Sequence, residues 1–114
     1  MNVRLYLWQR GTAAIMVPMI LVHLAVIFYA MDRPLTAEQI LSRTQGSFAW
    51  GLFYGMFVLL ASIHASIGIR NVLSEWGKLK SGTAAGVSTV FGAALIVLGL
   101  RAVAAVVLPA GMLP

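Results

Sequence analysis

Three long stretches without a charged residue constrain this chain more than any other feature. No Asp, Glu, Lys or Arg occurs from Gly11 to Met31, from Thr44 to Ile69 or from Ser81 to Leu100. Each stretch has about the 20 apolar residues that an α-helix needs to cross the hydrocarbon core of a membrane. Backbone amides in lipid must be hydrogen-bonded within their own segment. The sequence therefore predicts an all-α membrane protein with three transmembrane helices.

The predicted helices form a single transmembrane domain spanning residues 1–114. We expect them at about residues 11–31, 48–76 and 83–108. The loop after the first helix contains Thr36-Ala-Glu-Gln39, a capping-box pattern that predicts a short additional helix. The patterns Gly51-x-x-x-Gly55 and Gly82-x-x-x-Gly86 are typical of closely packed membrane helices. Three helices bury few side chains from lipid, so we expect further contacts with other subunits.

The net charge of +5 reflects topology, because the cations lie at the edges of the apolar stretches. Arg4 and Arg10 precede the first helix, and Arg70, Lys78 and Lys80 lie near the turn between the second and third. Lys and Arg accumulate on the cytoplasmic side of membrane proteins. The pattern predicts a cytoplasmic N-terminus and a periplasmic C-terminus in a bacterial inner membrane, with the lipid bilayer as partner and no nucleic acid. The absence of cysteine excludes disulfides and iron–sulfur clusters held by this chain.

The chain has two histidines, His23 and His64, and both lie inside apolar stretches. Ionisable groups within a membrane are usually functional, and a neutral imidazole is a common ligand of haem iron. Counted from Gly11 and from Trp76, each histidine is twelve residues from the cytoplasmic edge, which predicts similar depths. Each histidine could instead be a structural hydrogen-bonding group between helices.

The helical faces distinguish the two histidines. His64 shares its face with Ala61, Gly68, Asn71 and Glu75, where small neighbours leave room for a flat macrocycle and polar residues lead to the cytoplasmic edge. His23 shares its face with Thr12 and two methionines, which are more often packing residues than ligands. The pattern favours His64 as a haem ligand over His23.

The segment "HASIGIRNVLSEW", residues 64–76, resembles the second-helix signature of the membrane-anchor subunits of succinate:quinone oxidoreductases, which comprise succinate dehydrogenase and fumarate reductase. The segment "QRGTAAI", residues 9–15, is similar to the opening of their first helix. The resemblance implies a cytochrome b-type anchor in which His64 is an axial ligand of haem b. The second ligand would then come from a sister membrane-anchor subunit.

The resemblance also implies roles for other residues. Glu75, Trp76 and Thr12 would contribute to a site for a quinone, either ubiquinone or menaquinone. Arg10 and Arg70 would neutralise haem propionates, and Gly68 would leave space for the haem. His23 departs from the single-haem pattern; it could bind a second haem, pair with His64 across one haem, or serve packing alone.

The expected partners are a flavoprotein subunit and an iron–sulfur subunit of the respiratory chain. The dicarboxylate chemistry requires a flavin that this chain cannot bind, so no catalytic residue is assigned to it. One alternative is a cytochrome b subunit of another respiratory dehydrogenase, such as a formate dehydrogenase or hydrogenase. Others are a haem-free anchor or small membrane scaffold, and a small transporter or channel subunit, for which the third helix offers few polar residues.

Overall fold

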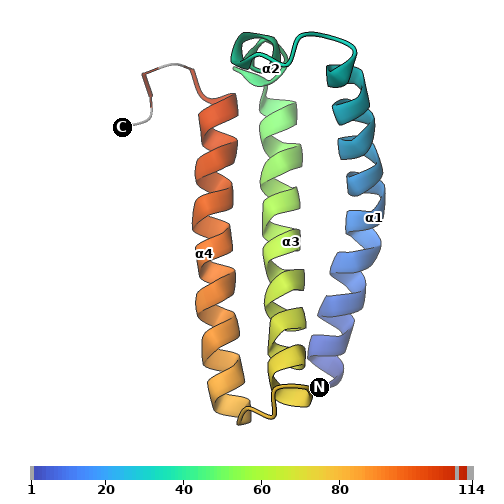
Figure 1. Cartoon of the computed structure of the whole chain (residues 1–114), viewed down its shortest axis with the longest axis vertical. Coiled ribbons are helices and arrows are strands. Elements are labelled where there is room, and N and C mark those ends of the chain that lie inside the picture. The colour runs from blue at the N-terminus through green and yellow to red at the C-terminus, as the bar shows by residue number, and fades with distance from the viewer. Residues whose placement is uncertain (1, 110, 113–114) are drawn as a thin grey trace.

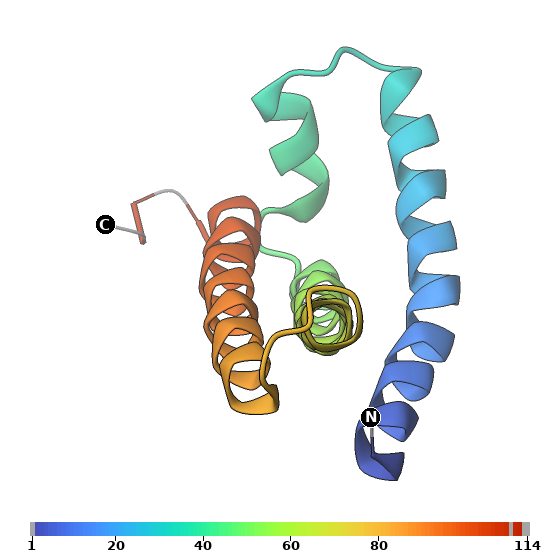
Figure 2. The ribbon, with the colours of Figure 1, turned by 60° about the horizontal axis from the view of Figure 1, so that its bottom comes forward.

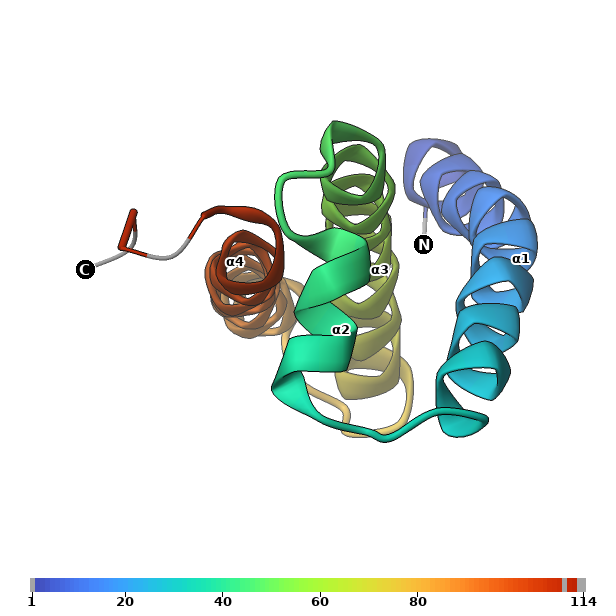
Figure 3. The same cartoon turned by 90° about the horizontal axis from the view of Figure 1, so that it is seen from above.

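The computed structural model describes residues 2–109 and 111–112. Within them lie four α-helices: α1 (Val3–Met31), α2 (Ala37–Thr44), α3 (Phe48–Glu75) and α4 (Ser81–Val107). The long helices stand side by side with α3 between α1 and α4 (Figure 1), and α2 lies across the end of the bundle (Figure 3). The three long helices are long and apolar enough to cross a membrane, which confirms the predicted spans.

The predicted start of the first helix was wrong, because α1 begins at Val3 rather than near Gly11. The Asn2 side chain accepts a hydrogen bond of 2.9 Å from the Leu5 amide and caps this earlier start. Residues 3–10 therefore extend the membrane-spanning helix by about two turns. The predicted short helix is confirmed as α2, where the Thr36 hydroxyl accepts a hydrogen bond from the Gln39 amide.

Helices α3 and α4 form the tightest contact, through a row of small residues on α4. Ala84, Ser88 and Gly92 are buried in this contact. A Cβ built on Gly99 would lie 2.5 Å from a methyl carbon of Val58, so a larger residue there would force Val58 or the helix to shift. The glycines at positions 92 and 99 thus bring the two backbones close together, as small residues do in membrane bundles.

The predicted close-packing glycines have little part in this contact. Of the four, a Cβ on Gly51 would meet Val107 at 3.1 Å, and a Cβ on any of the other three would meet nothing within 4 Å. Within the described residues Gly55, Gly82 and Gly86 make no such close contact, so close packing at these three glycines stays a prediction.

Helix α1 lies close to α3 at its N-terminal end and diverges from it toward Met31 (Figures 1 and 2). Thr12 is its one buried residue in the described structure. Most of the large apolar side chains of α1 are exposed, including Leu21, Phe28 and Met31. The outer surface of this helix is therefore suited to lipid or to another membrane helix.

Candidate functional site

Among the described residues, His64 meets α1 at one polar contact, with Thr12. Its Nδ1 lies 3.3 Å from the hydroxyl oxygen of Thr12, which is only 2% exposed. The same hydroxyl donates to the backbone carbonyl of Trp8 at 2.7 Å, with the Gln9 carbonyl at 3.1 Å. The threonine is thus fixed to its own helix, and the imidazole is held between α1 and α3 through one ring nitrogen.

A second contact lies about one helical turn away. There the side chain of Gln9, three residues before Thr12 on α1, lies against Gly68, four residues after His64 on α3. A Cβ built on Gly68 would lie 3.5 Å from Gln9 Nε2, so the glycine leaves room for the carboxamide. The other end of this amide, Oε1, is buried without a hydrogen-bond partner among the described residues. Buried acceptors are normally paired, so an unpaired amide oxygen beside His64 indicates a place where a further group donates a hydrogen bond.

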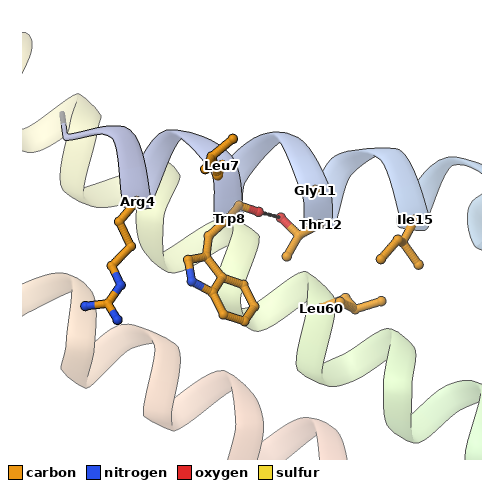
Figure 4. A pocket seen from close by; sticks show the side chains of 7 residues that line it. All are labelled: Arg4, Leu7, Trp8, Gly11, Thr12, Ile15 and Leu60. Atoms are coloured by element: carbon orange, nitrogen blue, oxygen red, sulfur yellow. Dashed lines mark hydrogen bonds between the residues drawn. The ribbon is translucent and has the colours of Figure 1, made fainter.

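A groove of about 300 Å³ runs along α1 beside this contact (Figure 4). Trp8, Thr12 and Ile15 project from α1 on one side of it, and Leu60 of α3 lies opposite. Arg4 stands at the end of the groove nearest the N-terminus. The groove is therefore lined mainly by apolar side chains and carries one cation, Arg4, at its N-terminal end.

His23 belongs to a different site. Its Nδ1 lies 3.3 Å from the hydroxyl of Tyr54, and its ring stands edge-on to Tyr54 and Phe57. The ring lines a cavity of about 710 Å³ between the diverging end of α1 and the other three helices. The cavity is lined mainly by apolar side chains, and Arg43 of α2 contributes a cation to it.

The predicted similar depth of the two histidines was wrong. His64 lies level with Thr12 on α1, and His23 is eleven residues further along that helix, or about 16 Å. The prediction failed because it counted from Gly11, whereas α1 begins eight residues earlier. Two imidazoles so far apart cannot touch one iron, which excludes a haem held between His23 and His64 of the same chain.

The remaining predicted residues lie near the C-terminal end of α3 and near the N-terminal end of α1. Glu75 is the last residue of α3, and Trp76, the C-terminal cap, is 82% exposed. Arg70 is partly buried. Arg10 is exposed, and its guanidinium carbon lies 5.7 Å from the centre of the Tyr6 ring. The structure therefore brings together His64, Thr12 and Gly68, while Arg10, Glu75 and Trp76 face outward.

Sequence reasoning missed Gln9, Tyr54 and Arg43. Gln9 was noticed only as part of a motif, although it lies three residues before Thr12 and hence near the same helical face. Tyr54 and Arg43 come near His23 only because α2 and α3 line the same cavity as α1. A hydroxyl or a cation on another helix gives no local signal of that proximity.

A family model described as the succinate dehydrogenase/fumarate reductase transmembrane subunit matches residues 2–108 of the chain. No curated protein matches significantly. No solved structure does so either. The matched range contains all three membrane-spanning helices together with both histidine sites. The chain therefore belongs to the family of succinate dehydrogenase and fumarate reductase transmembrane subunits.

Proposed function

We propose that this chain anchors a succinate dehydrogenase or fumarate reductase to the membrane, ligates haem b through His64 and forms part of a quinone site. The contact between His64 and Thr12 carries the proposal. It occupies Nδ1 and leaves Nε2 as the ring nitrogen available to a metal. Iron-ligating histidines characteristically use their second ring nitrogen for such a hydrogen bond.

The surroundings of His64 fit a haem. Among the described residues no three His, Asp or Glu side chains gather around a metal, and haem iron needs only axial ligands from the protein. The Gln9 carboxamide lies against Gly68, one turn from His64, and its amide N–H groups are donors suited to a haem propionate. Gly68 adds no side chain to this space. Haem b, when bound, supplies reversible one-electron transfer; the chain's residues hold the ligand ring and exclude water around it.

Polar residues near the same membrane edge complete the proposed site. Arg10 and Arg70 supply positive charge for propionates at that edge. The exposed Trp76 and Glu75 offer a stacking surface and a carboxylate to a quinone where the iron–sulfur subunit docks. Thr12 is committed to His64 in this structure, so its proposed contribution to quinone binding is indirect.

The cavity beside His23 favours a second haem site. Its volume, its apolar lining and the cation of Arg43 suit an amphipathic macrocycle, and the Tyr54 hydroxyl orients the imidazole. Because the levels of the two histidines are about 16 Å apart, the two proposed sites would lie in different halves of the helix pair. A histidine from the sister anchor subunit would complete each site.

The proposed setting is the inner membrane of a bacterium, with the N-terminus in the cytoplasm. The flavoprotein and iron–sulfur subunits would dock on the cytoplasmic side, where Arg4, Lys78 and Lys80 lie. The exposed apolar faces of α1 and α4 would contact lipid and the sister anchor subunit. Chemistry on the dicarboxylate belongs to the flavin-carrying partner.

The test is the haem content of the gently solubilised complex with its co-purifying subunits. The native wild-type complex should give the optical spectrum of a bis-histidine haem, and pyridine haemochrome analysis should identify that haem as haem b. His64→Ala should lose that haem, and His23→Ala should lose a second, spectrally separate haem while keeping the first. A colourless wild-type complex that still contains the flavoprotein would identify a haem-free anchor. A wild-type spectrum in His64→Ala would remove His64 from the site.

A further inference from the structure

The Thr12 hydroxyl has one hydrogen and three oxygen or nitrogen atoms within reach. The carbonyl of Trp8 is at 2.7 Å, that of Gln9 at 3.1 Å, and His64 Nδ1 at 3.3 Å. The direction of this hydrogen decides which ring nitrogen of His64 is protonated. The distances settle the direction.

Two oxygen atoms lie 2.7 Å apart only when a hydrogen lies between them, because their lone pairs otherwise repel. The carbonyl of Trp8 carries no hydrogen, so the Thr12 hydroxyl must donate to it. Donation from a threonine to the carbonyl four residues earlier is common within helices. Toward α3 the hydroxyl therefore presents only lone pairs, and the His64 contact requires an N–H on Nδ1.

We propose that Thr12 is a positioning residue that fixes neutral His64 in its Nδ1-protonated tautomer and leaves the Nε2 lone pair free for iron. This inference rests on the proposed haem ligation by His64. Through Thr12, helix α1 would help to orient the iron ligand without touching the metal itself. The contact spans two helices, so it also sets the orientation of the ring.

The environment makes this contact specific. Thr12 is 2% exposed, so water has little access to replace its hydroxyl. Its β-branched side chain has few rotamers in a helix, and the 2.7 Å bond fixes which one is used. An acceptor at Nδ1–H raises the basicity of the ligand, and loss of such a partner typically weakens metal binding about 10- to 100-fold.

The experiment compares Thr12→Val, Thr12→Ser and Thr12→Ala in the assembled complex. Valine keeps the shape and removes the acceptor, whereas serine keeps the acceptor. Thr12→Val should bind haem about 10- to 100-fold more weakly. Its haem should have a higher midpoint potential, because a less basic ligand stabilises the ferric state less, and a changed low-spin electron paramagnetic resonance spectrum. Thr12→Ser should resemble the wild type.

Ser62→Ala is the matched control. Ser62 is 3% exposed and donates to the Val58 carbonyl at 2.7 Å, as Thr12 does to Trp8, but it lies on another face of α3. This variant should keep the wild-type potential and spectrum. If Thr12→Val does not assemble, the difference between Thr12→Ser and Thr12→Ala isolates the hydroxyl.

An unchanged haem affinity, potential and spectrum in Thr12→Val would overturn the inference, as would equal losses in Thr12→Ser and Thr12→Ala. Failure of the proposed function is visible separately, as a wild-type complex without haem. In that case ¹⁵N chemical shifts of labelled His64 still decide the tautomer. Protonated Nδ1 in the wild type and a mixture of tautomers in Thr12→Val support the assignment, and protonated Nε2 in the wild type refutes it.

Discussion

At the scale of single residues, the absence of a side chain is as important here as its presence. Gly99 permits α4 to approach α3, since a Cβ there would lie 2.5 Å from the Val58 side chain. Gly92 has the same role against Ser66, whose hydroxyl donates to the Ser88 carbonyl at 2.8 Å. These contacts hold α3 in place, and α3 carries His64.

Gly99→Ala should destabilise the chain by about 1–3 kcal/mol, because Val58 is stiff within its helix and cannot move aside without shifting α4. The measurement is the denaturation midpoint of the purified complex. Gly86→Ala in the same helix is the control, since a Cβ there meets nothing within 4 Å. The double variant Gly99→Ala with Val58→Ala should regain part of the loss, and strict additivity would contradict this account.

At the scale of elements, α2 is fastened to α4 rather than resting freely on the bundle. The Thr44 hydroxyl donates to the Val106 carbonyl at 2.7 Å, and the Gly46 amide donates to the Val107 carbonyl at 2.7 Å. These bonds use carbonyls at the C-terminal end of α4 that have no partner within the helix. Helix α2 thereby closes the end of the cavity beside His23.

Thr44→Val should lower the free energy of local opening of α2 by about 1 kcal/mol, because it removes one hydrogen bond to the end of α4. Hydrogen exchange in α2 should accelerate about fivefold, while the middle of α3 exchanges as before. Ser42→Ala serves for comparison, because the Ser42 hydroxyl bonds only within α2. Equal protection of α2 in Thr44→Val and wild type would show that the bond does not fasten the helix.

The positions of the helices could be predicted from sequence, because charge-free length and the Thr36 cap are local signals. The start of α1 could not be predicted. Arg4 and Arg10 indicated the edge of the membrane, but the helix already begins at Val3, where Asn2 caps it. That error moved His23 to the wrong depth. Of the site, His64 and Gly68 were identifiable from their motif, whereas the contact with Thr12 depends on the register between two helices.

At the scale of the whole molecule, the chain is a thin layer of three spans with little interior of its own. Ile67 and Ala84 are the buried apolar residues in the described part of the chain. Side chains as large as Phe48, Val90 and Leu98 are exposed. Such a surface is stable in lipid and against other membrane helices.

The proposed orientation can be tested with single cysteines, because the natural sequence has none. Glu38→Cys lies in α2, and Lys80→Cys lies in the turn before α4. In intact spheroplasts a membrane-impermeant maleimide should label Glu38→Cys, and should label Lys80→Cys only after permeabilisation. The reverse labelling would place the N-terminus outside and refute the topology.

Both imidazoles bridge the first and second spans, one to Thr12 and the other from His23 to Tyr54. The two rings proposed to ligate haem are thus also polar contacts that join the first span to the second. A change in the orientation of either ring alters how firmly the first span is held, so the proposed haem binding would be coupled to the docking of that helix.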